Sequence, residues 1–225
     1  MFPLSDVNIR RTFPLVNYLI IIANIVVFLL ELGAYNTDTF INTYAFVPSR
    51  FVWTDPSSYA PILYAMFMHG SLMHILGNMW FLHVFGDNIE DTFGHIKYLL
   101  FYIAGGVIAA FAQYVLMPTT SIPLLGASGA VAAVAGAYFV LFRNSQIKTL
   151  VALIVIWTIV RVPAWIILGY WFLIQLVSGF GSLGQVGNAD VGGVAFWAHI
   201  GGFVFGCVVA LLISKTTHYN NNYDA

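Results

Sequence analysis

Side chains that can carry out acyl transfer occur in three apolar segments of the chain. The segment HGSLMHILGNMW, His69–Trp80, contains two histidines and an asparagine, GASGA at 126–130 contains Ser128, and AHIGGFVFG at 198–206 contains His199. A hydroxyl, an imidazole that can take its proton, and amide groups that can donate hydrogen bonds are the parts of a nucleophilic hydrolase. These residue types make hydrolysis by a nucleophilic side chain a candidate function.

The spacing within the first segment follows a helix. His74 and Asn78 are four residues apart, about 40° around an ideal helix, and therefore share one face. His69 comes five residues before His74, about 140° away, so a regular helix cannot bring both rings to one place. We therefore expect His69 at the start of this helix, where it would hold a loop.

Small residues follow the serine and the last histidine at helical intervals. The two stripes are Ser128, Ala132 and Gly136, flanked by Gly129 and Ala133, and His199, Gly202 and Gly206. Small side chains allow helix backbones to approach each other closely inside a membrane. The sequence therefore predicts two tightly packed helices, with the hydroxyl near the end of one and the imidazole near the end of the other.

The composition is that of a membrane protein. Of 225 residues, 60% are apolar and only 8% are charged, whereas soluble domains carry roughly 25% charged residues. A net charge of −1 without a basic cluster excludes a nucleic-acid partner. The single cysteine, Cys207, excludes an intrachain disulfide framework and a multi-cysteine metal site.

Apolar runs long enough to cross a bilayer predict an all-α, single-domain protein with six membrane spans. The predicted spans are 15–32, 61–85, 96–116, 125–142, 163–180 and 193–213. A long outer loop is expected at 33–60, an apolar connection near the membrane interface at 149–160, and a disordered tail at 216–225. Arg161 and Pro163 favour a fifth span that begins near the proline.

The basic residues orient these spans. With a cytoplasmic N-terminus, seven of the eight Lys and Arg residues fall inside or at the inner interface, and only Arg50 falls outside. Six spans then place both termini in the cytoplasm. Ser128, His199 and the start of the second span would lie at a similar depth near the outer surface.

Three motifs on these spans are similar to those of a known family. HGSLMHILGNM, GASGA and AHIGGFVFG, in this order on the second, fourth and sixth spans, resemble the rhomboid intramembrane serine proteases. GDNIEDTFG, at 86–94, matches the family's Gly-x3-Glu-x3-Gly pattern, with Glu90 as its acidic residue. The resemblance extends from about residue 15 to residue 213 and implies a six-helix rhomboid-like bundle.

The resemblance implies a role for each matching residue. Ser128 would be the nucleophile and His199 its base, without a carboxylate, and Asn78 and His74 would stabilise the oxyanion with the Ser128 N–H. Structural roles near the site fall to His69, Gly126, Gly129, Gly202, Gly206 and Glu90, the last as a cap or bridge at the cytoplasmic end of the second span. The family often has Tyr where this chain has Ala132.

Further expectations from the resemblance concern access to the site. The fifth span would be a movable side wall, with Trp165, Trp171 and Phe172 as candidate gate residues, and the glycine-rich segment 179–193 would form a flexible cap. The implied function is an intramembrane serine endopeptidase that needs no metal or cofactor. Its partners would be transmembrane protein substrates and the lipid bilayer. Without large soluble extensions, a bacterial-type plasma membrane is the expected location.

Two other functions remain open from the residues. His69, His74 and His199 could relay protons or bind a transition metal in a transporter or channel. A catalytically silent rhomboid-like scaffold could bind membrane proteins without cleaving them, although such proteins typically lack the serine or the histidine that this chain keeps.

Overall fold

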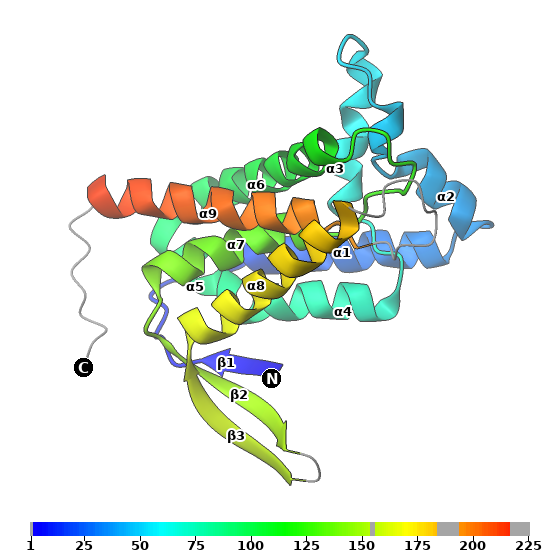
Figure 1. The fold of residues 1–225 in the computed structure, drawn as a ribbon. Helices are drawn as coiled ribbons and strands as arrows, with labels where there is room; N and C mark the ends of the chain where they lie inside the picture. Colours follow the sequence, from blue (N-terminus) through cyan, green and yellow to red (C-terminus); the bar gives the residue numbers. More distant parts are fainter. Residues whose placement is uncertain (1, 154–155, 184–193, 217–225) are drawn as a thin grey trace.

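The computed structural model describes residues 2–153, 156–183 and 194–216 and is mostly helical (Figure 1). Within these residues, four helices are long and apolar enough to cross a membrane. They are α1 (Leu15–Leu32), α6 (His95–Leu116), α8 (Ala164–Leu183) and α9 (Phe196–Thr216). A shorter apolar helix, α7 (Ser128–Leu141), lies among them. The chain is therefore a multi-pass membrane protein.

The segment predicted as one second span, 61–85, is broken in the structure. Its pieces are α3 (Ala60–Ala65), α4 (Leu72–Phe81) and a π-helical turn (Leu82–Gly86), and α5 (Asp87–Phe93) follows directly. Ser71 caps α4 by accepting a hydrogen bond from the His74 N–H, and Glu31 of α1 accepts one from the His69 N–H. Apolar content alone could not reveal this break, because polar caps create it.

The predicted outer loop, 33–60, has structure of its own. It contains α2 (Thr37–Tyr44) and 3₁₀ turns at Pro48–Arg50 and Pro56–Ser58. The ring of Phe51 contacts those of Trp53 and Tyr59 in this loop, and the ring of Phe111 on α6. Aromatic packing therefore anchors the loop to α6.

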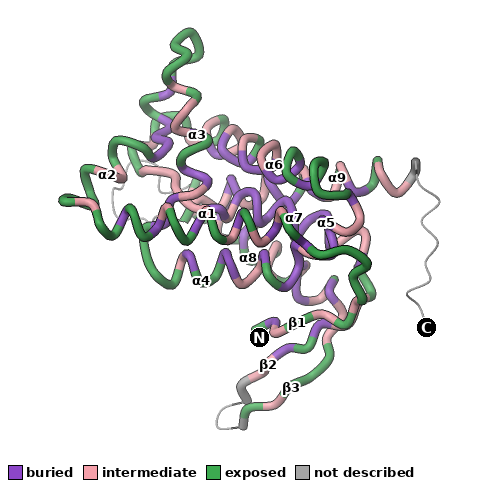
Figure 2. The backbone as a smooth tube through the Cα atoms, turned by 180° about the vertical axis from the view of Figure 1, so that it is seen from behind, coloured by how far each residue is buried: buried purple, intermediate pink, exposed green. Residues whose placement is uncertain are grey.

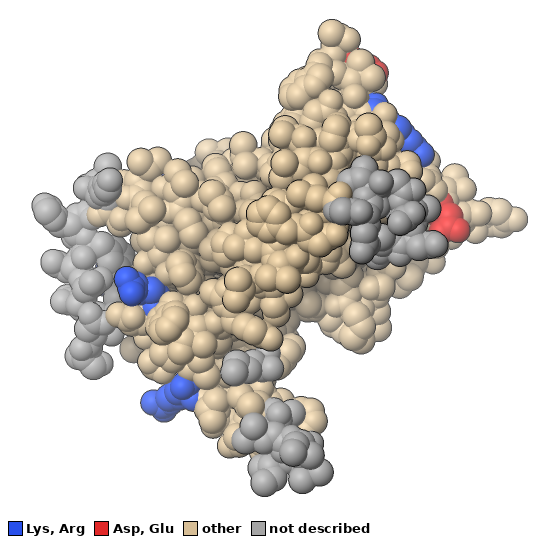
Figure 3. All heavy atoms as spheres, viewed as in Figure 1, with Lys and Arg blue, Asp and Glu red and all other residues tan. Residues whose placement is uncertain are grey.

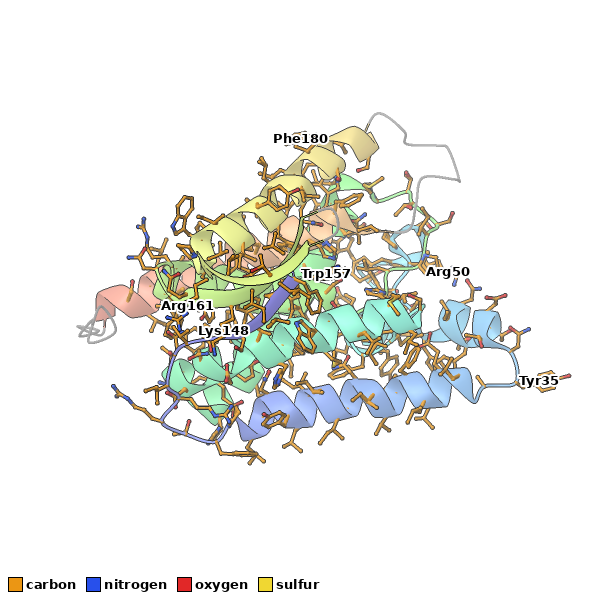
Figure 4. All side chains as sticks on the ribbon, turned by 90° about the horizontal axis from the view of Figure 1, so that it is seen from below. Tyr35, Arg50, Lys148, Trp157, Arg161 and Phe180 are labelled. Carbon is orange, nitrogen blue, oxygen red and sulfur yellow. The ribbon has the colours of Figure 1, made fainter. Side chains whose placement is uncertain are left out.

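The expectation of an all-α fold misses a three-stranded antiparallel sheet. Its strands, in spatial order, are β1 (Phe2–Asp6), β2 (Gln146–Leu153) and β3 (Ile156–Pro163). The predicted interfacial connection, 149–160, is thus mostly a β-hairpin, and its many Val, Ile and Thr residues favour strands. Figure 4 shows Lys148 and Arg161 close together on this hairpin, where the two residues pair across the strands.

The fifth and last helices differ in their bounds from the predicted spans. Pro163 ends β3, and α8 begins at Ala164 and continues to Leu183. Residues 179–183 of the expected flexible cap are therefore helical, whereas 184–193 lie outside the described residues. Thr216 is the last residue of α9, and the rest of the predicted tail, 217–225, also lies outside them.

Helix α7 lies at the centre of the bundle (Figure 2). Every residue from Gly129 to Tyr138 is buried, between α6 and α9. Charged side chains on the face in Figure 3 lie toward the ends of the bundle and on the hairpin, with a broad uncharged zone between them. This distribution suits a protein whose middle lies in lipid.

Strand β1 is fixed to the bundle through the carboxylate of Asp6. One oxygen of Asp6 accepts hydrogen bonds from Tyr138 at 2.7 Å, Asn8 at 3.0 Å and Asn88 at 2.6 Å. Burial of the carboxyl raises the pKa of Asp6 from 3.8 to about 6, although the hydrogen bonds act in the opposite direction. The nearby charge of Asp87, whose own pKa is also raised by burial, adds to the increase.

This pKa predicts that the protein loses stability as the pH rises from 4 to 7. A folded-state pKa above the unfolded value stabilises the fold below pH 4, and this contribution disappears as the pH passes 6. The loss between pH 4.5 and 7 should be roughly 2 kcal/mol. Asp6→Asn should remove most of this pH-dependent loss of stability and leave only the part due to Asp87. The measurement is thermal unfolding of both proteins across this pH range. An unchanged pH dependence in the variant would contradict the assignment.

Candidate active site

One cavity of about 450 Å³ brings the predicted chemical groups together. Ser128, His199, His74 and Asn78 all line it, and they come from α7, α9 and α4. Trp171 of α8 completes a wall of this cavity. Residues separated by more than 120 positions in the sequence thus face one space.

Ser128 begins α7, directly after a turn with an unusual backbone conformation. The first N–H groups of a helix have no partner within the helix, so the Ser128 N–H is free to donate. Gly126, two residues earlier, has a φ of +118°, which an L side chain rarely adopts, and its N–H donates to the Ala65 carbonyl at 2.9 Å. The helix therefore starts from a fixed turn, with the hydroxyl half-buried at the cavity.

His74 lies against this turn. A Cβ placed on Gly126 would be 2.6 Å from Nε2 of His74 and 3.5 Å from Oγ of Ser128. Only a glycine at this position allows the imidazole and the hydroxyl to approach the same backbone atom. Gly126 thus leaves room for the His74 ring beside Ser128.

Asn78 and His69 form a hydrogen-bonded pair beside Ser128. Nδ2 of Asn78 is 3.0 Å from Nε2 of His69, and because the amide nitrogen can only donate, the imidazole nitrogen accepts. The bond leaves one amide hydrogen of the buried Asn78 free. His69 thus contacts a cavity residue through its side chain, beyond the loop-holding role that its position in the sequence suggested.

His199 is held from α8. Its Nδ1 lies 2.7 Å from Oε1 of Gln175, and the ring of Trp171 lies 5.7 Å from its own ring, centre to centre. Among the described residues, no hydrogen bond joins Ser128 to His199. Catalytic hydrogen bonds often form only once a substrate is bound, so this geometry is compatible with a dyad.

The small-residue stripes bring α7 and α9 into backbone contact. A Cβ on Gly202 would overlap the Gly129 carbonyl oxygen, and one on Gly206 would overlap the Ala133 carbonyl oxygen. Even one methyl group at either position of α9 would therefore force the helices apart. This close packing fixes how far apart the N-terminal ends of α7 and α9, and hence the hydroxyl and the imidazole, lie.

The candidate gate residues of α8 occupy three different environments. Trp171 lines the cavity, and its ring lies 6.3 Å from that of Phe81 on α4. Phe172 stacks on Phe203 of α9 at 4.4 Å, whereas Trp165 is 47% exposed. Of the three, only Trp171 combines a place at the cavity with a contact to α4.

Glu90 acts away from the cavity. Its two carboxylate oxygens accept hydrogen bonds from the N–H groups of Val16 at 2.9 Å and Asn17 at 2.7 Å. These donors belong to the first turn of α1, where negative charge is favourable. Glu90 therefore ties α5 to the start of α1, and His95 also contacts its carboxylate.

Sequence reasoning missed Gln175, the partner of His199. Its side chain is 6% exposed within an otherwise apolar helix, and its Nε2 donates to the Trp171 carbonyl at 3.3 Å. A lone amide in an apolar span was the available signal. At Ala132, where the family often has Tyr, the side chain is buried, and the ring that contacts His199 is instead that of Trp171.

The described residues hold no group of three or more His, Cys, Asp or Glu side chains that could bind a metal ion. Of the three histidines considered for a transporter, His69 and His74 lie with their ring centres 5.2 Å apart. His199 is committed through Nδ1 to Gln175.

Comparison with known proteins gives consistent matches. The family model described as Rhomboid domain matches residues 56–216. Presenilin-associated rhomboid-like protein, mitochondrial, of Bos taurus is 36% identical over 93 residues, which cover 39% of this chain and 25% of that protein. Rhomboid-like protein 11, chloroplastic, of Arabidopsis thaliana is 25% identical over 194 residues, which cover 84% of this chain and 64% of that protein. The chain thus spans less than two thirds of these relatives, but the family model covers most of it, and the chain belongs to the rhomboid family.

Proposed function

We propose that this protein is an intramembrane serine endopeptidase with a Ser128–His199 dyad. The observation that carries the proposal is the cavity on which a serine at a helix N-terminus and an imidazole of another helix both open, together with Asn78 and His74. These groups supply a nucleophile, a base and oxyanion donors. Membership of the rhomboid family supports the same chemistry.

The hydrogen bond between His199 and Gln175 supports one route for the proton transfers. With Nδ1–H of His199 donating to Gln175, Nε2 is free to take the Ser128 proton as Oγ attacks the carbonyl carbon of the substrate. The Ser128 N–H, the free amide hydrogen of Asn78 and the His74 imidazole would then stabilise the oxyanion. Nε2 returns the proton to the leaving amine, and water hydrolyses the acyl-enzyme by the same route.

The proposed substrates are transmembrane segments of other proteins. A helical peptide bond is protected by its own hydrogen bonds, so residues that weaken a helix near the cleaved bond should favour cleavage. Phe81 and Trp171 contact each other between α4 and α8, next to the cavity, and this side is the proposed access route from the membrane.

The proposed topology has six spans, with both termini in the cytoplasm. In Figure 4, Tyr35 and Arg50 lie toward one end of the bundle, whereas Lys148 and Arg161 lie toward the other. This separation supports a cytoplasmic location for the sheet. A bacterial-type plasma membrane stays a prediction from the sequence, and the relatives named above are mitochondrial and chloroplastic.

A serine-directed probe tests the proposed function. A fluorophosphonate should label the purified protein in liposomes at Ser128, as mapped by mass spectrometry, because only an activated hydroxyl reacts rapidly with it. The same preparation should cleave a model transmembrane substrate, with no loss of rate in the presence of a chelator.

Two outcomes would contradict the proposal. Cleavage that a chelator abolishes would point to metal chemistry instead of the dyad. A folded protein that neither reacts with the probe nor cleaves any of several transmembrane substrates would favour the non-catalytic scaffold.

A further inference from the structure

Gln175 joins the wall of the cavity to the candidate base. It lies on α8, four residues after Trp171, so both side chains project from one face of this helix toward His199. The amide is buried and uses both of its ends: Nε2 donates to the Trp171 carbonyl, and Oε1 accepts from Nδ1 of His199. An amide held at both its nitrogen and its oxygen restricts what its partner can do.

We propose that Gln175 is a positioning residue that fixes the tautomer and ring orientation of His199. The proposal deepens the proposed function and rests on it. Since the amide nitrogen is committed to its own helix, the carbonyl oxygen faces the ring and can only accept. The imidazole must therefore carry its proton on Nδ1, which leaves Nε2 unprotonated to act on Ser128.

Within the described part of the chain, Gln175 is the hydrogen-bond partner of the His199 ring. Among the described residues that line the cavity, none carries a carboxylate, and Ala132 cannot supply a ring to stack on the imidazole. Trp171 restricts the ring from one side but offers it no acceptor in the described structure. Without Gln175, the two neutral tautomers of His199 would be close in energy, and the ring could turn.

The hydrogen bond and the ring contact described for the imidazole both come from α8. Trp171 also reaches Phe81 of α4, so α8 lies between the proposed access side and the base. A displacement of α8 away from α9 therefore removes the hydrogen bond and the ring contact together. In the proposed cycle, His199 is ready to act only when α8 is seated against α9.

The test replaces the amide by a side chain of similar size that cannot accept a hydrogen bond. Gln175→Leu should lower the rate of fluorophosphonate labelling and the kcat for a transmembrane substrate by about 10- to 100-fold each, with KM little changed. The small probe reports the reactivity of Ser128 without requiring a substrate helix to enter. Asn24→Leu, which removes another buried amide on α1 away from the cavity, is the matched control and should keep wild-type rates.

A second variant distinguishes positioning of His199 from a purely structural role of Gln175. Gln175→Glu keeps an acceptor and adds a negative charge, which favours the protonated imidazole. Its activity should exceed that of Gln175→Leu, and the acid limb of its pH–rate profile should shift to higher pH. This variant also keeps the proposal testable if Gln175→Leu does not fold.

The outcomes separate this proposal from the proposed function. If wild-type protein neither reacts with the probe nor cleaves substrate, the dyad itself fails. If the wild type reacts and folded Gln175→Leu reacts at the same rate, only the role of Gln175 is overturned. A Gln175→Glu profile identical to that of the wild type would overturn it as well.

Discussion

Replacement of Ser128 by Ala should abolish cleavage of a transmembrane substrate, and His199→Ala should do the same. Each change removes one of the two groups that the proposed chemistry requires, and loss of such a group lowers kcat by about 10⁴-fold or more in serine hydrolases. The double variant should be little worse than either single one, because the two side chains act as a unit. The measurement is the rate of appearance of the cleaved fragments in liposomes.

Matched substitutions away from the cavity serve as controls. Ser214→Ala, near the end of α9, and His83→Ala, on an exposed position of the π-helical turn, should leave the rate unchanged. Ser128→Ala and both controls should unfold at temperatures close to that of the wild type, since the half-buried hydroxyl adds little to packing. His199→Ala should cost about 1–3 kcal/mol of stability, because it leaves the buried Gln175 oxygen without its donor, but the protein should remain folded. Sustained proteolysis by clean Ser128→Ala protein would refute the dyad.

The sequence could predict those residues of the candidate site that belong to short local motifs. Helical spacing put His74 and Asn78 on one face, and the small-residue stripes predicted close packing of two helices. In the structure, these side chains and Ser128 and His199 all line one cavity. Their chemical roles stay predictions, which the variants above test.

Other features depended on contacts that no local pattern contains. Gln175 could be recognised as unusual, but its partner lies 24 residues away on another helix. The interruption of the second span results from a Ser71 cap and from a carboxylate of α1 that bonds the His69 N–H. A composition window averages over such caps and reports one long apolar segment.

The β2–β3 hairpin also shows that an apolar run alone does not identify a membrane helix. Residues 149–160 are as apolar as a span, and only their β-branched side chains separate strand from helix. Pairing of β2 with the N-terminal β1 completes the sheet, and this contact joins segments more than 140 residues apart. The sequence of the hairpin alone cannot predict that β1 is its third strand.

Gly206→Ala should also cause a large loss of cleavage activity, although Gly206 is not among the residues that line the cavity. A methyl group there would overlap the Ala133 carbonyl oxygen and approach the Ala137 nitrogen, both of which belong to the backbone of α7 and cannot rotate away. The helices must therefore separate, and overpacking of this kind costs about 1–3 kcal/mol of stability. Because His199 lies two turns earlier on α9, a shift of about 1 Å at the site should lower the cleavage rate by about 100-fold.

Gly181→Ala is the control, because a Cβ at this position of α8 would have no atom of the described residues within 4 Å. It adds the same methyl group to a membrane helix and should keep wild-type activity and melting temperature. Cys207, beside Gly206, donates from its thiol to the Gly136 carbonyl at 3.3 Å, so the two helices are in contact along this whole stretch. If Gly206→Ala cleaved substrate at the wild-type rate, the spacing of α7 and α9 would not control the reaction, and the two stripes would serve only to build the bundle.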